Sequence, residues 1–132
     1  MQKILLSGGA GALSQELVRQ NSSFEIVSLP KEALNVHHKE SVLAKTRLHK
    51  PNIFLHAGAL THPMEVHGED PTLSIQNNII GTANVAQCCA ASGIKMVYIS
   101  TDWVYPNKKN NTEEDALLPC TPYGWSKLGG EC

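Results

Sequence analysis

The sequence predicts an α/β fold in which helices cover a parallel β-sheet. Three observations support this prediction. Short apolar segments alternate with segments whose apolar residues recur at helical spacing. A glycine-rich turn directly follows the first apolar segment, and hydroxyl side chains end the last one. Because ligands of open α/β sheets bind beyond the carboxyl ends of the strands, we expect a binding site at that edge.

Length and charge restrict the fold and the partners. With 132 residues, the chain is long enough for one domain with a core. Eleven basic and twelve acidic side chains give a net charge of -1, and no Lys/Arg-rich block occurs. This balance argues against nucleic acid or anionic lipid as a partner and favours a small molecule. No leader or apolar run of membrane length is present, so we expect a cytoplasmic location and no membrane contact.

The first strand and its turn resemble a phosphate-binding element. Residues Lys3–Ser7 form a continuous apolar strand of the kind buried on both faces. The turn Gly8–Gly11 follows, and a helix then begins whose apolar residues are Leu13, Leu17 and Val18. Glycine allows a tight turn and close approach to a ligand, and the first N–H groups of the helix can bind phosphate. A dinucleotide site is one interpretation, and glycine used for turn geometry alone is the other.

The second strand, Phe24–Leu29, lacks the acidic residue that commonly follows it in NAD sites. Lys31 stands nearby instead and could face the additional phosphate of NADP. The sequence therefore favours NADP(H) over NAD(H), although a solvated loop lysine would look the same.

The middle of the chain continues the alternation. We expect a helix over Glu40–His49 and a third strand over Ile53–Ala57. A polar loop over 62–71 precedes one long helix from Thr72 to about Ser92, which ends at Gly93.

The end of the chain carries the strongest candidate for catalysis. A fourth strand, Lys95–Thr101, is followed by an irregular loop and by a helix that contains Tyr123 and Lys127. Residues four apart lie on one side of a helix, so an ammonium can lower the pKa of a neighbouring phenol. Such a tyrosine could act as a general acid or base. The spacing also occurs by chance.

Together these elements predict a Rossmann-like, doubly wound parallel sheet that stops after about four strands. Residues 1–132 would form a single NAD(P)-binding domain. A sheet of this size would leave apolar surface beside the last helix, so we expect a homodimer or another association through that face.

Cysteine and histidine provide no metal site. The four cysteines contain no Cys-x-x-Cys pair, and we expect them to be reduced thiols. Only His62 and His67 lie close together in a loop, without a carboxylate or cysteine at a ligand spacing. We therefore expect no metal, and two solvated histidines.

Six segments occur in one order along nearly the whole chain. They are Gly8–Ser14, Leu34–Val36, His56–Thr61, Asn78–Val85, Ser100–Tyr105 and Tyr123–Glu131. In this order and spacing they resemble the extended short-chain dehydrogenases/reductases, and within that superfamily most of all the dTDP-4-dehydrorhamnose reductases. The resemblance implies reduction of the C4 keto group of a nucleotide-linked sugar by NADPH or NADH.

The resemblance also implies roles for single residues. Tyr123 would donate a proton to the sugar carbonyl and contact the cofactor. Lys127 would hold the nicotinamide ribose and lower the tyrosine pKa, and Thr101 would hydrogen-bond the carbonyl. Asp102 matches a position near the substrate, although a loop cap is as good an interpretation. Asn78 would steady the active site. The positions that match the pyrophosphate turn, the adenine wall and the strip along the cofactor are Gly8, Gly11, Ala12, Leu13, Asn35, Val36, Ala57, Gly58 and Ala59.

Some positions depart from the family pattern. Ser14 replaces the third glycine, Asn35 replaces a common Asp, and His56 stands where Asn is frequent. Family members also continue beyond Cys132 into a substrate-binding region. Two other hypotheses therefore compete with that of an active reductase. The chain would be a non-catalytic nucleotide-binding or regulatory module, or an inactive truncated remnant of such a reductase.

Overall fold

A four-stranded parallel sheet forms the centre of the molecule. The computed structural model describes all residues 1–132. The strands are β1 (Lys3–Ser7), β2 (Glu25–Leu29), β3 (Ile53–His56) and β4 (Lys95–Tyr98), in the spatial order β2-β1-β3-β4. All three neighbouring pairs are parallel. The predicted Rossmann-like α/β class is confirmed. Strand β1 has its predicted bounds, β2 begins one residue later than predicted, and β3 and β4 end one and three residues earlier than the apolar segments suggested.

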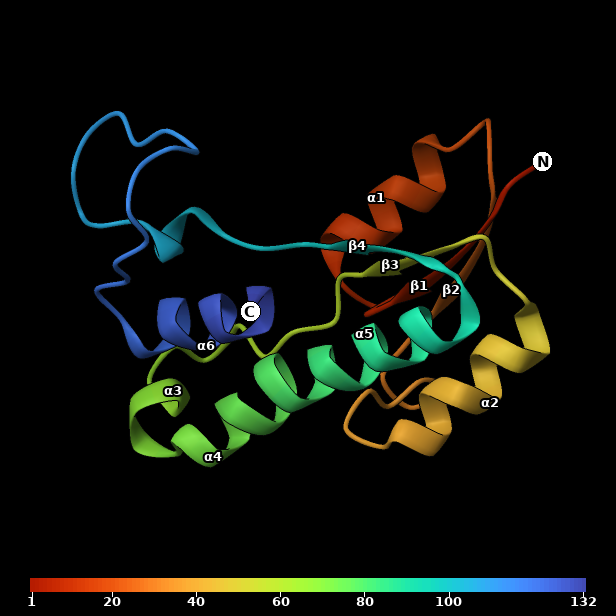
Figure 1. The fold of residues 1–132 in the computed structure, drawn as a ribbon, viewed down its shortest axis with the longest axis horizontal. Coiled ribbons are helices and arrows are strands. Elements are labelled where there is room, and N and C mark those ends of the chain that lie inside the picture. Colours follow the sequence, from red (N-terminus) through yellow and green to blue (C-terminus); the bar gives the residue numbers. More distant parts are fainter.

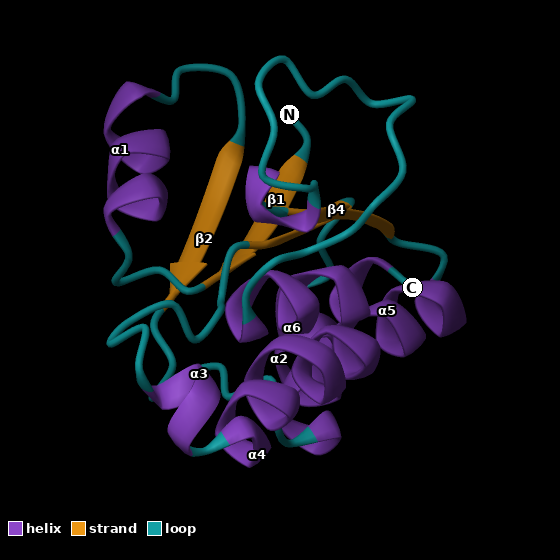
Figure 2. Ribbon diagram, turned by 90° about the vertical axis from the view of Figure 1, so that its left-hand side faces the viewer, coloured by secondary structure: helices purple, strands orange, loops and turns teal.

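Helices cover the two faces of this sheet unequally. Helix α1 (Ala12–Gln20) lies on one side, and α2 (Lys39–His49), α5 (Gly81–Ser92) and α6 (Pro122–Glu131) lie on the other (Figures 1 and 2). The core forms where α2 and α5 pack on the sheet, and its fully buried members are Leu5, Leu34, Val42, Phe54, Val85, Cys88 and Cys89. On α1, by contrast, Leu13, Leu17 and Val18 stay between one third and one half exposed.

The long helix predicted over 72–92 is helical throughout but changes its winding. It consists of α4 (Pro71–Ser74), a π-helical segment η1 (Ile75–Ile80) and α5. Asp70 caps its start by accepting a hydrogen bond from the Thr72 amide, and Gly93 ends it with a positive φ of 65°. A π-helical turn widens the helix locally and rotates the side chains that follow it. Asn78 lies within this segment.

The polar loop before this helix contains an element that the sequence did not reveal. Residues Val66–Glu69 form the short helix α3. His62 is exposed, as expected, but His67 is only 1% exposed, so the expectation of a solvated side chain was wrong for His67. Its imidazole forms hydrogen bonds to the Ser74 hydroxyl and the Thr61 carbonyl, which replace the water that a loop histidine would use.

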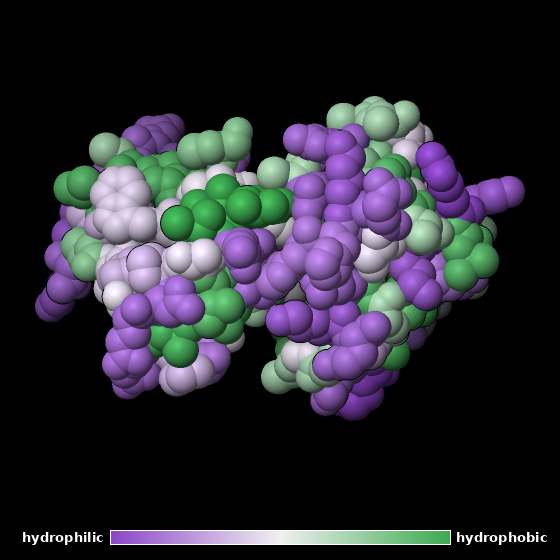
Figure 3. Space-filling view, turned by 90° about the horizontal axis from the view of Figure 1, so that it is seen from below, coloured by the Kyte–Doolittle hydropathy of each residue, from purple (hydrophilic) through white to green (hydrophobic).

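The edge of the sheet at β4 carries exposed apolar side chains. Val97 on β4 and Trp125 on α6 are 37% and 53% exposed. On the face seen from below, which is the side of α4, α5 and α2 in Figure 1, hydrophobic groups also reach the surface between hydrophilic ones (Figure 3). The exposure of Val97 and Trp125 agrees with that expected beside the last helix. Association through the face stays a prediction. No helix has both the length and the apolar character needed to cross a membrane.

A glycine allows α6 to pack tightly. An added Cβ at Gly124 would clash with the Trp103 carbonyl oxygen and lie 3.0 Å from the Pro119 Cβ. The Thr121 hydroxyl accepts a hydrogen bond from the Gly124 amide and so caps the helix.

We therefore predict that Gly124→Ala lowers the free energy of unfolding by about 2 kcal/mol, because backbone atoms must move to accommodate the methyl group. Urea denaturation followed by tryptophan fluorescence measures the change. The matched control is Gly68→Ala on α3, where an added Cβ meets nothing within 4 Å. This control should be neutral or stabilise by up to about 1 kcal/mol. Equal losses in both variants would contradict the packing argument.

Candidate functional site

One cavity lies at the carboxyl ends of β1 and β3. Its volume is about 310 Å³, within the usual range for small-molecule sites. Its lining contains all ten predicted cofactor residues that precede Tyr123: Gly8, Gly11, Ala12, Leu13, Lys31, Asn35, Val36, Ala57, Gly58 and Ala59. It also contains residues to which the sequence analysis gave no cofactor role of their own, namely Ser7, Ala10, Ser14, Leu34, His37, Thr61 and Asn77. Tyr123 and Lys127 are not part of this lining.

The floor of the cavity depends on a close approach of two backbone segments. Gly8 has a φ of 77°, and an added Cβ there would lie 2.8 Å from the Gly58 Cα. At Gly9, it would lie 2.8 Å from the Leu29 carbonyl carbon. The Gly11 amide donates a hydrogen bond to the Gly8 carbonyl at 2.9 Å, which closes the turn. Only glycine fits at position 8, because the positive φ and the lack of space both exclude a side chain.

Ser14 stands at the position of the usual third glycine, where its side chain is buried. The residue is 1% exposed, and its hydroxyl has no hydrogen-bond partner in the protein. A buried hydroxyl without a partner costs about 1–3 kcal/mol. Ser14 also lines the cavity, so a polar group of a ligand could supply the missing partner.

A second wall of the cavity is the segment 34–37, which the helix α5 holds in place. The Asn84 side-chain amide donates to the Val36 carbonyl at 2.9 Å and to the His37 carbonyl at 3.1 Å. Gly81 lets Val36 approach, since an added Cβ would lie 2.7 Å from its Cγ2. The Asn35 carboxamide oxygen accepts from the His37 amide and so stabilises the turn.

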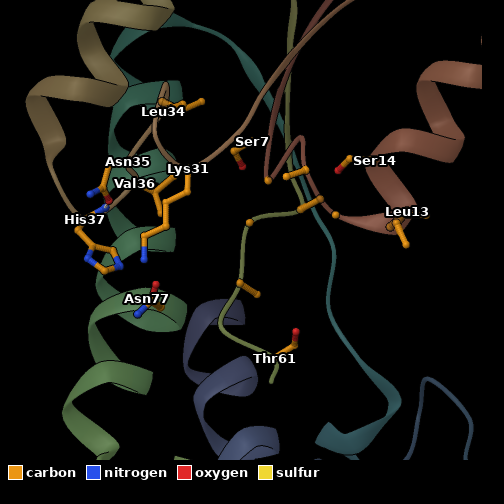
Figure 4. Close-up of a pocket in the computed structure, with 17 residues that line it drawn as sticks. Ser7, Leu13, Ser14, Lys31, Leu34, Asn35, Val36, His37, Thr61 and Asn77 are labelled. Atoms are coloured by element: carbon orange, nitrogen blue, oxygen red, sulfur yellow. Dashed lines mark hydrogen bonds between the residues drawn. The ribbon is translucent and has the colours of Figure 1, made fainter. Parts of the chain in front are cut away.

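Charged and polar side chains gather at this wall. Lys31 and His37 extend from the loop after β2 on one side of the cavity, with Asn77 below them, whereas Leu13 and Ser14 lie on the opposite side (Figure 4). Lys31 is the only Lys or Arg in the lining. The arrangement provides a cation and several donors at one end of the cavity, which suits an anionic group.

Tyr123 lies in an aromatic cluster outside this cavity. Its ring centroid is 5.1 Å from that of His67 and 5.6 Å from that of Trp103. Burial raises the pKa of the Tyr123 phenol, the Thr101 hydroxyl opposes this shift, and the charge of Asp102 adds to it. Thr101 also caps the 3₁₀ helix η2 (Asp102–Val104) by accepting from the Trp103 amide. The cap at this loop is therefore Thr101, whereas Asp102 is exposed.

Lys127 is buried and engaged elsewhere in the protein. It is 3% exposed, its Nζ donates to the Ile99 carbonyl at 2.7 Å, and it lies 4.3 Å from the centroid of the Tyr98 ring. Burial lowers the pKa of the ammonium to about 8, against an opposing effect of Glu131. The expected lowering of the Tyr123 pKa is not observed, because burial outweighs every other influence on the phenol.

Asn78 connects the cavity side of the molecule to α6. Its side chain accepts from the Leu60 amide at 2.7 Å and donates to the Leu60 carbonyl at 3.0 Å and the Ser126 hydroxyl at 2.9 Å. Leu60 lies between the cavity-lining residues Ala59 and Thr61, and Ser126 lies between Tyr123 and Lys127 in sequence. The structure thus brings the predicted proton donor and the cavity into one connected region.

The sequence matches one family model over its whole length. The family model described as the RmlD substrate binding domain matches residues 1–132, which is the whole chain. The chain belongs to this family. Its membership rests on the complete match and is independent of the site geometry.

Individual relatives extend the comparison. A spore coat polysaccharide biosynthesis protein, SpsK of Bacillus subtilis, is 33% identical over 99% of this chain and 47% of its own length. The subunit beta of methionine adenosyltransferase 2 from Rattus norvegicus is 30% identical over 98% of this chain and 42% of its own length. The chain therefore spans about half the length of the curated relatives it matches.

Among solved structures, dTDP-4-dehydrorhamnose reductase of Bacillus anthracis in complex with NADP superposes with a TM-score of 0.90. The two are 28% identical, and the match covers 98% of this chain and 47% of the other. The similarity extends over the sheet and the helices around the cavity.

We predict that Asn78→Ala lowers the free energy of unfolding by about 2–4 kcal/mol, since the buried groups of Leu60 and Ser126 lose their partner. The neighbouring Asn77 is only partly buried and donates a single hydrogen bond, to the Leu73 carbonyl, so Asn77→Ala should cost less than about 1 kcal/mol. Urea denaturation of both variants checks the difference. A cost below 1 kcal/mol for Asn78→Ala would show that the connection is weak.

Proposed function

We propose that this chain binds a nicotinamide dinucleotide in the cavity and carries the cofactor site and the proton donor of an NAD(P)H-dependent reductase. Its substrate would be the C4 keto group of a nucleotide-linked sugar, most specifically dTDP-4-dehydrorhamnose. One observation carries the proposal: every predicted cofactor residue before Tyr123 lines a single cavity. The similarity to an NADP complex of dTDP-4-dehydrorhamnose reductase supports it.

The cavity has the features that such a cofactor needs. The glycine turn brings backbone N–H groups to the start of α1, where the helix dipole favours a pyrophosphate. Within the segment 34–37, Leu34 and Val36 offer apolar contacts for a base, and the buried Ser14 hydroxyl lacks a partner. A bound reduced nicotinamide would supply hydride to the substrate.

The remaining chemistry falls to this chain's own side chains. Reduction of a ketone builds negative charge on its oxygen, and a phenol positioned there can donate the proton that neutralises it. Tyr123 has this role in our proposal, and its raised pKa keeps it protonated before the reaction. The Thr101 hydroxyl would donate a second hydrogen bond to the same oxygen. Lys127 would exchange its bond to the Ile99 carbonyl for the nicotinamide ribose.

The proposal includes a preference for NADP(H) over NAD(H). Lys31 is the only cationic Lys or Arg side chain in the cavity lining, and no carboxylate lines the cavity to bind the ribose hydroxyls of NAD. A lysine ammonium would pair with the 2′-phosphate of NADP.

Accordingly, Lys31→Ala should weaken NADPH binding by about tenfold, the equivalent of one charge-assisted hydrogen bond, and leave NADH affinity unchanged. Fluorescence titration of both cofactors measures this. Lys39→Ala is the matched control, because Lys39 binds Gln87 and does not line the cavity. An equal loss for both cofactors would exclude recognition of the 2′-phosphate by Lys31.

The catalytic part of the proposal is tested with Tyr123→Phe. We expect turnover of dTDP-4-dehydrorhamnose with NADPH to fall by at least about 100-fold, because the proton donor is removed while the ring remains. NADPH affinity should stay within about twofold, since the phenol does not line the cavity. Nicotinamide absorbance follows the turnover. A variant with undiminished turnover would remove Tyr123 from the mechanism.

A second candidate function is a cofactor-binding subunit without turnover of its own. The 30% identity to a protein named as subunit beta of methionine adenosyltransferase 2 favours it. The two functions differ in one result. Saturable NADPH binding by the wild-type chain without reduction of the sugar nucleotide would support the subunit, whereas reduction would support the enzyme.

A further inference from the structure

His56 occupies a central place that the proposed mechanism does not use. It is the last residue of β3, it is fully buried, and both of its ring nitrogens have hydroxyl partners. Nδ1 lies 2.7 Å from the Ser7 Oγ, and Nε2 lies 3.1 Å from the Thr82 Oγ1. Ser7 ends β1 and lines the cavity, whereas Thr82 belongs to α5. His56 thus bridges the cofactor turn and the helical layer.

The surrounding hydrogen bonds determine which nitrogen carries the proton. The Thr82 hydroxyl has a single hydrogen and donates it to the Asn78 carbonyl at 2.8 Å. Thr82 can therefore only accept from His56, so Nε2 must carry a hydrogen. In the neutral ring Nδ1 is then the acceptor, and the Ser7 hydroxyl must donate to it. The chain of donors runs from Ser7 through His56 and Thr82 to Asn78.

This series of hydrogen bonds connects to both halves of the proposed site. At one end, Ser7 directly precedes Gly8, whose backbone packs against Gly58. At the other end, the Asn78 side chain holds Ser126 on α6, the helix of Tyr123 and Lys127. All side chains in this series of hydrogen bonds are at most 5% exposed, so water cannot replace a lost partner.

The environment also keeps the ring neutral. Burial, and secondly the charge of Lys127, lower the pKa of His56 to about 4. The other titratable group that faces the ring is Tyr98, at a centroid distance of 5.8 Å, and burial raises the pKa of its phenol to about 12. Lys127 is therefore the only charged neighbour near neutral pH among these groups, and it repels a protonated imidazole.

We propose that His56 is a positioning residue: as the Nε2–H tautomer, it fixes the glycine turn of the cofactor cavity relative to α5 and thereby to the helix of Tyr123. This inference rests on the proposed cofactor site. It gives His56 a role that neither the resemblance to the reductases nor the family match implies.

Two variants separate hydrogen bonding from space filling. In His56→Gln the side-chain amide can still donate toward Thr82 and accept from Ser7, whereas His56→Leu fills a similar volume without polar atoms. We expect His56→Leu to weaken NADPH binding by at least about tenfold, through loss of the fixed turn, and His56→Gln to stay within about threefold of wild type. Fluorescence titration on folded samples measures both. Unchanged affinity in a folded His56→Leu variant would overturn the proposal.

The wild-type protein provides two further readouts that need no cofactor. Nitrogen-15 NMR of the imidazole should show the Nε2–H tautomer at pH 7, and an Nδ1–H tautomer would overturn the assignment. Because the folded pKa lies below the ordinary value of 6.5, the unfolded state binds the proton more readily between pH 6.5 and about 4. As the pH is lowered through this range, the folding equilibrium constant of the wild type should therefore fall by up to about tenfold per pH unit, relative to that of His56→Gln.

These measurements also keep the two proposals apart. If the wild-type chain does not bind NADPH, the proposed function fails, while the tautomer and the acid sensitivity still decide on His56. A pH dependence identical in wild type and His56→Gln would overturn the buried neutral histidine even when the cofactor binds. If His56→Leu does not fold, His56→Gln and the NMR measurement decide.

Discussion

The side-chain amide of Asn78 is the interaction on which the arrangement of this site depends. It joins Leu60 on the cavity side to Ser126 on α6, and the backbone carbonyl of Asn78 accepts a hydrogen bond from the Thr82 hydroxyl. One residue therefore satisfies groups from three segments in a buried region. The π-helical turn that contains Asn78 departs from regular helical winding. A local irregularity of the helix thus coincides with the position where side chains from distant parts of the chain must meet.

Close backbone contacts shape the cavity as much as side chains do. Gly8 against Gly58, Gly9 against β2 and Gly81 against Val36 are approaches at which a methyl group would not fit. They bring peptide groups to the surface of the cavity, where N–H donors can face a ligand. The cost is conformational entropy, because each glycine loses more freedom on folding than any other residue. Hydrogen bonds such as those of Asn84 to the segment 34–37 offset part of that cost.

The parts of this structure that the sequence predicted are those with local causes. Strand and helix segments follow from apolar periodicity, and the glycine turn follows from conformational freedom within a few residues. The burial of His67 and the roles of Asn84 and Ser126 depend instead on partners outside the local segment, some of them almost fifty positions away in the chain. The raised pKa of Tyr123 likewise follows from burial, which spacing alone does not reveal. The residues that the family resemblance matched to the cofactor line one cavity. Among the residues that hold this lining in place, the resemblance gave a role to Asn78 but none to Asn84.

The cavity lining lies entirely between Ser7 and Asn77, whereas Thr101, Tyr123 and Lys127 follow later in the chain. In the proposed function, the residues that line the dinucleotide cavity would therefore precede the residues of proton transfer in the chain, and Lys127 would be a residue of the later stretch that also contacts the cofactor. If the proposal holds, substitutions near Lys31 would change which dinucleotide binds without altering the side chains proposed for proton transfer. Asn78 lies between the two stretches and binds Leu60 on one side and Ser126 on the other. We therefore expect Asn78 to be kept whichever stretch changes.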